Sequence, residues 1–170
     1  MRGVSPIVTI EYSPIPNIRI VGGTLDRRSS VNHGLGEPMF DYDRKFYATK
    51  EDGIQVFAHT KHWNTEMWCN WEDFIVVGSP WQEKFTFGWS NKFLASWGKN
   101  HSQKLDIPLN LMMNHRGGQI DAVKDTCIET LANFSAGLDY QLELGRKHSH
   151  YISMSLPFYG FSNRSSESHI

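Results

Sequence analysis

Hydrophobic and polar residues alternate along much of this chain, and the longest alternation runs from Phe85 to Trp97. Its odd-numbered positions are mostly aromatic, and its even-numbered positions are mostly small or polar. Because side chains on a β-strand point alternately to two faces, this pattern predicts a strand with one aromatic face. At about 3.3 Å per residue such a strand spans roughly 40 Å, far more than the usual strand of about 5–6 residues. That length favours a barrel over a sandwich of short strands.

Shorter alternating stretches predict further strands on both sides of this segment. They cover residues 7–12, 18–24, 40–49, 54–63, 105–113, 134–144 and 152–158. Asp-Gly favours tight hairpins, so Glu51-Asp52-Gly53 predicts a turn that pairs residues 46–49 with residues 54–63. Residues 64–71, which are rich in Trp, are expected to be irregular.

One segment has a helical period instead. Between Gln119 and Ala132 the apolar residues recur at the spacing of one face of an amphipathic helix: Ile120, Val123, Cys127, Ile128 and Leu131. The polar residues from about Ser162 predict a frayed tail. The sequence therefore predicts a single β-rich domain over residues 1–170. Its fold class is all-β, an antiparallel barrel of about eight strands with one short amphipathic helix near 119–132, and the alternative is a β-sandwich.

The alternation does not reveal what the apolar faces contact. In a membrane barrel they face lipid, and in a soluble barrel or sandwich they face a protein core. The long strands, the abundant Trp and Tyr and the short polar turns favour the membrane. The helix opposes it, and so does the N-terminal segment, which lacks the continuous apolar run of a signal peptide. No window approaches the roughly 20 apolar residues of a transmembrane helix.

Three segments carry a resemblance to known proteins. They are the strand–turn–strand from Phe134 to Phe158, the aromatic strand from Phe85, and GIQVFAHTKHW at Gly53–Trp63. In this pattern the chain resembles the small outer-membrane-type β-barrel proteins that bacteria and some phages encode. The resemblance implies an outer-membrane location with lipid or detergent as the partner. Otherwise we expect a soluble or virion-associated protein that binds protein partners or assembles with itself.

Composition narrows the function classes. The net charge of −1 gives no overall field that would attract nucleic acid, so no nucleic-acid partner is expected. Neither cysteine has a CxxC neighbour, which excludes a zinc ribbon or a CxxC redox motif. Cys69 and Cys127 could form a disulfide only in an oxidising compartment, and two buried thiols are the expected state. The sequence leaves their bonding open.

Candidate metal ligands come from two groups of histidines. His59 and His62, with Glu66 nearby, would share a face on a helix, but on the predicted strand they point to opposite faces. His148 and His150 share a face on a strand and could bind a metal if a third ligand arrived from elsewhere. Basic neighbours beside that pair would repel a cation.

No catalytic residue and no cofactor are predicted. Ser90 lies mid-strand, and its Gly-Trp-Ser-Asn context lacks the closing glycine of a nucleophile elbow. The candidate ligand or interface residues are those of the aromatic stripe: Phe85, Phe87, Trp89, Phe93 and Trp97.

Three functional hypotheses follow. The first is a non-enzymatic β-barrel of outer-membrane type that inserts in a membrane or has a structural role. The second is a soluble β-rich virion or assembly protein that uses its aromatic face as a core or subunit interface. The third, which is least favoured, is a metal-dependent hydrolase that uses the histidines.

Overall fold

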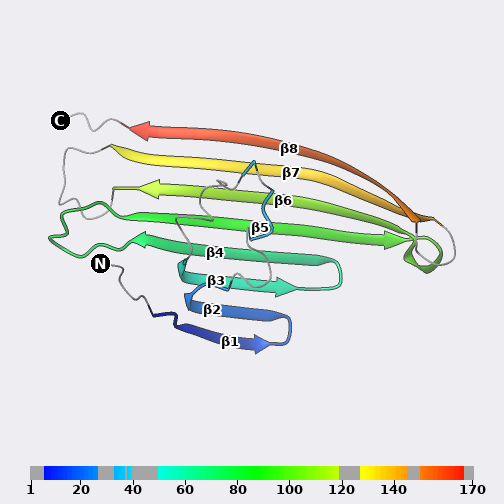
Figure 1. Ribbon diagram of the computed structural model, residues 1–170, viewed down its shortest axis with the longest axis horizontal. Helices are drawn as coiled ribbons and strands as arrows, with labels where there is room; N and C mark the ends of the chain where they lie inside the picture. Colours follow the sequence, from blue (N-terminus) through cyan, green and yellow to red (C-terminus); the bar gives the residue numbers. More distant parts are fainter. Residues whose placement is uncertain are drawn as a thin grey trace.

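Eight strands form one antiparallel sheet in sequence order in the computed structural model (Figure 1). The structure describes residues 6–26, 33–36, 38–39, 50–118, 127–144 and 150–166. The elements are β1 (Thr9–Ile15), β2 (Ile18–Thr24), β3 (Asp52–His59), β4 (Trp63–Asp73), β5 (Lys84–Trp97), the 3-10 helix η1 (Lys99–His101), β6 (Gln103–Arg116), β7 (Ile128–Leu144) and β8 (His150–Ser166). The predicted all-β antiparallel fold is confirmed.

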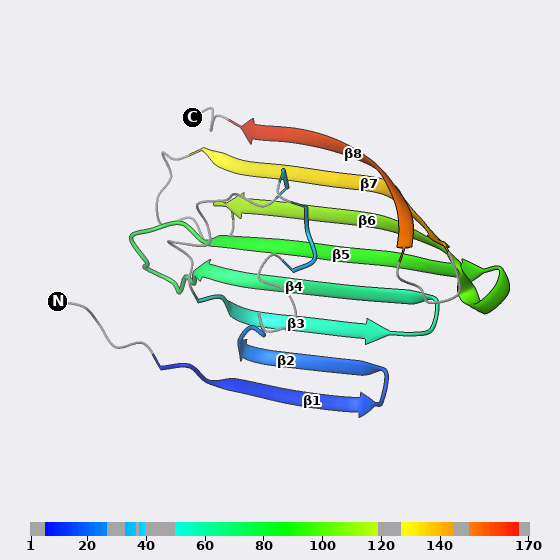
Figure 2. The ribbon, with the colours of Figure 1, turned by 45° about the vertical axis from the view of Figure 1, so that its right-hand side comes forward.

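The sheet is curved and barrel-like, and β8 bends strongly near its beginning (Figure 2). Among the described residues, no hydrogen bonds pair β1 with β8 to close it. All eight strands belong to this one sheet, so the alternative of a two-sheet sandwich is wrong. Within the described part of the chain we find no helix with the length and apolarity to cross a bilayer.

Two local predictions about the middle of the chain are wrong. Asp52 and Gly53 begin β3 instead of forming a turn, because Gly53 is paired on both sides, with Gly23 of β2 and Asn70 of β4. Residues 64–71, expected to be irregular, lie inside β4 and pair with both β3 and β5. In both cases hydrogen bonding to two neighbouring strands outweighs the local signals. The strand predicted at 40–49 lies outside the described residues.

The predicted helix near 119–132 is also wrong where the structure describes it. Ile128 to Ala132 already belong to β7, which pairs with β6 on one side and β8 on the other. Residues 119–126 lie outside the described part. The frayed tail is a further error, because β8 continues through residues 162–166 along β7. Pairing with distant strands determines the secondary structure of these segments, and the local spacing of apolar residues contains no information about that pairing.

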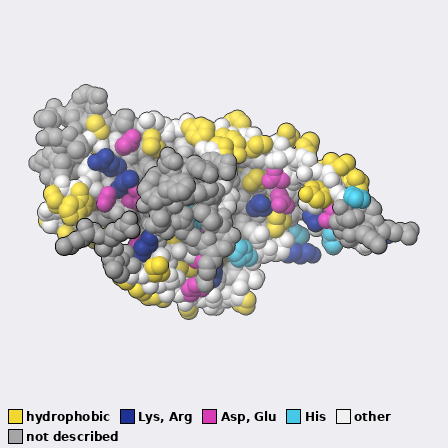
Figure 3. Space-filling model, viewed as in Figure 1, with side chains coloured by type: hydrophobic (Ala, Val, Ile, Leu, Met, Phe, Trp, Pro, Cys, Tyr) yellow, Lys and Arg dark blue, Asp and Glu magenta, His cyan; other side chains and the backbone are white. Residues whose placement is uncertain are grey.

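The two faces of the sheet differ in chemistry. Residues paired across strands share a face, so the register defines rows that run across the sheet. One row of the first face, here called the apolar face, contains Met67, Trp89, Leu111 and Phe134. A row of the opposite face, the polar face, contains Glu66, Ser90, Asn110, Ser135 and Tyr159. Figure 3 shows the polar face, where charged and histidine side chains are spread over the sheet.

The apolar face carries most of the exposed large hydrophobic side chains of the strands, including the candidate stripe residues Phe93 and Trp97. Three of its Trp rings have acceptors within the protein for their N–H groups. Trp89 Nε1 donates to Thr65 Oγ1 at 2.8 Å, Trp71 Nε1 donates to Glu83 Oε1 at 2.9 Å, and Trp63 Nε1 donates to Asn91. Such internal pairing suits a surface that contacts lipid, where an unpaired donor is costly.

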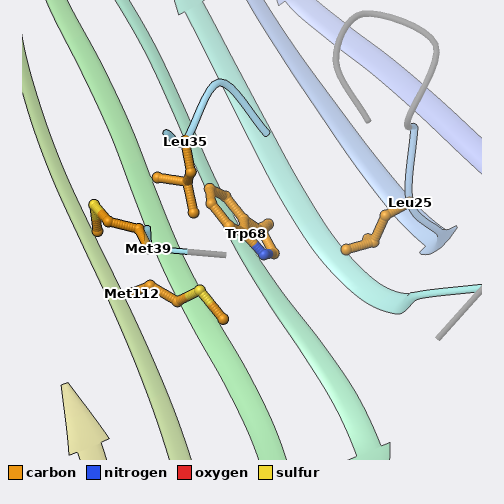
Figure 4. Close-up of a cluster of buried hydrophobic side chains, with 5 residues drawn as sticks. All are labelled: Leu25, Leu35, Met39, Trp68 and Met112. Atoms are coloured by element: carbon orange, nitrogen blue, oxygen red, sulfur yellow. The ribbon is translucent and has the colours of Figure 1, made fainter. Parts of the chain in front are cut away.

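A small hydrophobic cluster lies on the polar face. The described residues 33–36, 38 and 39, here called the inner segment, cross in front of the sheet (Figures 1 and 2). From this segment Leu35 and Met39 reach toward Trp68 on β4 and Met112 on β6 (Figure 4). The cluster thus fixes the inner segment on an otherwise polar surface.

Substituting Gly88 by alanine tests this packing. An added Cβ would lie 2.0 Å from Cζ2 of Trp68, so the buried indole ring must shift. We expect a loss of about 1–3 kcal/mol in the free energy of unfolding, measured by urea titration in detergent. Gly22→Ala is the matched control, because a Cβ there meets nothing within 4 Å. Equal stability of the two variants would contradict the packing.

Candidate functional site

A fully buried histidine from the inner segment lies between two carboxylates. His33 Nδ1 is 2.6 Å from Glu66 Oε1, and His33 Nε2 is 2.6 Å from Glu51 Oε2. Its ring stacks on Trp68, with 4.1 Å between ring centroids and 13° between planes. Carboxylates accept hydrogen bonds, so both ring nitrogens donate and the ring is an imidazolium.

The pKa of His33, which lies outside the strands, reflects two opposing effects. Burial alone lowers this pKa. The hydrogen bonds to Glu51 and Glu66 and the negative charges of these two carboxylates together outweigh burial, so the pKa of His33 lies above its ordinary value of 6.5. The raised pKa and the two carboxylate acceptors both favour the positively charged form of His33. In this protonation state it fixes and partly neutralises the carboxylates, and it is not itself a base.

Glu66 is held in place from one side only. Its Oε1 accepts from His33 and also from Gln55 Nε2 at 2.7 Å. Gln55 is itself fully buried and bonds the backbone of Asp26 through both ends of its amide. No described residue donates to Oε2 of Glu66. The carboxylate is thus oriented by rigid partners and keeps one oxygen for another group.

This carboxylate lines a cavity of about 250 Å³ on the polar face, here called the Glu66 cavity. Glu66 on β4 and Ser90 on β5 are direct cross-strand partners and both line it. Partners of this kind have Cβ atoms about 4.5–5.5 Å apart, so the two side chains start from neighbouring positions on the polar face. Lys92 and Arg19 bring two cations to the same cavity. An acceptor, a hydroxyl and cations in one place can support acyl transfer.

A second cavity, of about 190 Å³, lies beside the first and is here called the Tyr159 cavity. Gly34 and Lys92 border both cavities. A Cβ on Gly34 would be 2.8 Å from Ser90 Oγ, and one on Gly36 would be 2.9 Å from Tyr159 Oη. Glycine at these two positions lets the inner segment lie against the strands between the cavities.

The structure separates the metal candidates predicted from the sequence. His59 ends β3 and lines the Glu66 cavity, whereas His62 lies in the following turn with Nδ1 3.4 Å from the backbone oxygen of Leu94. His150 begins β8, and His148 is outside the described residues. In the part of the chain that the structure describes, no three His, Cys, Asp or Glu residues form a metal-binding group. The metal sites stay predictions.

The other sequence candidates lie away from both cavities. The stripe residues occupy the apolar face: Phe85, Phe87, Trp89, Phe93 and Trp97. Cys69 and Cys127 are free thiols, the first half-buried and the second exposed, so the expectation of two buried thiols is wrong.

Sequence reasoning did not single out His33 or Glu51, and it set Ser90 aside because the nucleophile-elbow motif is incomplete there. Nothing near His33 in the sequence signals its two distant carboxylate partners. Ser90 carried a usable signal, because it occupies a polar position of the Phe85–Trp97 alternation. If the aromatic face of this strand is taken to contact lipid, the side chains at the even-numbered positions point to the interior of the barrel. Ser90 and Lys92 then become candidates for an interior site.

Comparison with known protein families gives one match, which spans residues 1–170. The matching family is described as lipid A 3'-O-deacylase-type and is a bacterial outer-membrane enzyme family. Searches of curated proteins and of solved structures found no match. The match is consistent with the outer-membrane location that the barrel resemblance implied.

The family match corrects the main functional prediction. A non-enzymatic structural barrel is wrong, because the family is one of enzymes. The virion and phage assignments are also wrong, since the match supports a bacterial outer-membrane protein. The chain belongs to the lipid A 3'-O-deacylase-type family.

Proposed function

We propose that this chain hydrolyses the ester bond of an acyl chain on a lipid A-type glycolipid, and that the reaction takes place in the Glu66 cavity. The observation that carries the proposal is that an oriented carboxylate, Glu66, and the hydroxyl of its cross-strand neighbour Ser90 line one cavity. The family match supports ester hydrolysis as the reaction class.

Each residue then has a defined role. Ser90 Oγ attacks the ester carbonyl while Glu66 takes its proton, and the sugar hydroxyl leaves with that proton as the acyl group stays on Ser90. Water, deprotonated by Glu66, then releases the fatty acid and restores Ser90. The Lys92 ammonium offers a positive charge to the oxyanion that forms at the carbonyl.

His33 has a positioning role in this scheme. It holds Oε1 of Glu66 at 2.6 Å, so the second oxygen stays directed to the cavity as protons move. Gln55 fixes the same oxygen from the neighbouring strand. A preoriented base loses little free energy to reorganisation during the reaction.

The apolar face provides the membrane contact in this proposal. Its exposed side chains and internally bonded Trp rings suit lipid as the partner. A barrel-like sheet with lipid outside and the reacting groups on its polar side brings the enzyme to a membrane-bound substrate.

The test is acyl release from purified lipid A by the full chain in detergent, with free fatty acid and lipid mass measured by mass spectrometry. We expect Ser90→Ala and Glu66→Gln each to lower the rate by about 10²–10⁴-fold. Ser96→Ala is the matched control, because Ser96 lies on the same strand and face but outside the cavity. Wild-type rates in both cavity variants, or no fatty acid from the unmodified chain, would overturn the proposal.

A further inference from the structure

We propose that the connection between β4 and β5, residues 74–83 and here called the apolar loop, inserts into the surface of the lipid bilayer beside the sheet. Its partner is the boundary between the headgroups and the acyl chains of the membrane. The inference shares with the proposed function the premise that the apolar face contacts lipid, and it does not depend on ester hydrolysis.

The first argument is the exposure of the loop. Phe74, Val76, Val77 and Trp81 are each more than half exposed, and Val77 is 85 % exposed. In Figures 1 and 2 the loop extends beyond the ends of the neighbouring strands, and Figure 3 shows hydrophobic side chains gathered at that end of the molecule. Large apolar side chains exposed this close together mark a contact surface.

The second argument is charge and continuity, which favour lipid over a protein partner. Residues 74–82 contain no Asp, Glu, Lys or Arg, so the loop has no charged rim of the kind that surrounds protein interfaces. The charged pair beside the loop, Glu72 and Lys84, lies on the polar face with 2.6 Å between Oε2 and Nζ. Trp71, which lies just before the loop, is exposed on the apolar face. The exposed side chains of the loop therefore continue the surface to which lipid contact is assigned.

The third argument is that the loop pairs polar groups within itself. Ser79 N donates to Val76 O at 2.9 Å, and Val76 N donates to Ser79 Oγ at 3.0 Å. Trp81 Nε1 donates to the backbone oxygen of Phe74 at 3.3 Å. Gly78 has a φ of 93°, which suits the third position of a tight turn. Such internal pairing matters in a bilayer, because polar groups without partners are costly there.

The base of the loop is fixed to the sheet. The Glu83 side chain is 5 % exposed and its Oε1 accepts from Trp71 Nε1 at 2.9 Å. The backbone oxygen of Glu83 accepts from Gly117 N at 3.0 Å. A loop held at its base presents its apolar side chains in one arrangement, so insertion costs less ordering entropy.

The experiment places a nitrobenzoxadiazole label on Val77→Cys in the full chain, folded into phosphatidylcholine vesicles. Cys127→Ser is the background, and that background chain without a further change gives the signal of the half-buried Cys69. We expect emission at a shorter wavelength than in water and quenching by phosphatidylcholine that carries a doxyl group near its headgroup.

Two matched positions serve as controls. Lys61→Cys is exposed in the turn between β3 and β4, at the opposite end of the sheet, and its label should emit as in water without quenching by the doxyl lipid. Leu138→Cys is exposed on the apolar face, and its label reports whether that face contacts lipid.

The outcomes separate this inference from the proposed function. Lipid quenching at residue 77 supports insertion of the loop, even if lipid A is never deacylated. A label at 77 that emits as the one at 61 does overturns the insertion, and quenching at 138 would then leave the membrane contact of the apolar face standing. A short emission wavelength at 77 without lipid quenching also overturns it, because a protein surface would then cover the loop.

Discussion

Replacing His33 by alanine is expected to lower the free energy of unfolding by about 3–5 kcal/mol. Glu51 is 1 % exposed, and with Glu66 it would be left without the imidazolium that lies between the two carboxylates. Removing one partner of a buried ion pair leaves charge that water cannot reach, and this is the main part of the cost. The lost stacking on Trp68 adds to it.

The measurement is urea unfolding in detergent, followed by Trp fluorescence. His59→Ala is the control, because His59 is exposed at the end of β3 and has a long 3.4 Å contact with Asn64 and a ring contact with Phe57, but no ion pair with a buried carboxylate. A loss for His33→Ala as small as that of the control would show that the inner segment is not held by its ion pairs.

The same variant tests how the stabilising effect of His33 depends on pH. The pKa of His33 is raised in the folded state above its ordinary 6.5, so its stabilising effect is complete below that value and is lost as pH rises through the folded-state pKa. The stability difference between the unmodified chain and His33→Ala should therefore shrink in the alkaline range. A difference that stays constant with pH would mean that the ring acts by packing alone.

Leu111→Arg is expected to destabilise the protein in lipid bilayers by about 2–4 kcal/mol. Leu111 lies on the apolar face between its partners Trp89 and Phe134, near the middle of the sheet. A guanidinium there would have to leave water for hydrocarbon. Folding into vesicles, measured by urea titration, gives the free energy directly.

Asn163→Arg on the polar face is the control for this prediction, because it adds the same charge on the side away from lipid. We expect a change near zero for it. If Leu111→Arg were tolerated and Asn163→Arg were not, the polar side would be the one that faces lipid, and the assignment of the two cavities to an aqueous interior would be wrong.

The strands could be predicted where local alternation was strong. Phe85–Trp97 and Phe134–Leu144 carry the period of two without interruption, and both lie in strands of the structure. Prediction failed at Asp52-Gly53 and at Ile128–Ala132, where local residues favour a turn or a helix and pairing with distant strands decides otherwise. The family relationship was visible only as the general pattern of a membrane barrel.

Most of the candidate site could not be predicted from the sequence, for a different reason. His33, Glu51 and Glu66 are far apart in the chain, and only the fold brings each of the two carboxylates to 2.6 Å from a nitrogen of the His33 ring. A single histidine in a polar, Gly-containing stretch looks like any loop residue. The nucleophile elbow places its serine on a strand-to-helix turn, so that motif could not single out Ser90, which lies in the middle of a long strand.

The residues of the row from Glu66 to Tyr159 lie side by side only because the strands pair in one particular register. Each member of the row is aligned by the hydrogen bonds of the adjoining strands, from β4 to β8. One residue inserted into a strand would turn its following side chains to the opposite face and move a member of this row to the apolar face. Two inserted residues would restore the facing and shift that member along the strand by about 7 Å. Through evolution, such a site tolerates changes of length in its turns far better than in its strands.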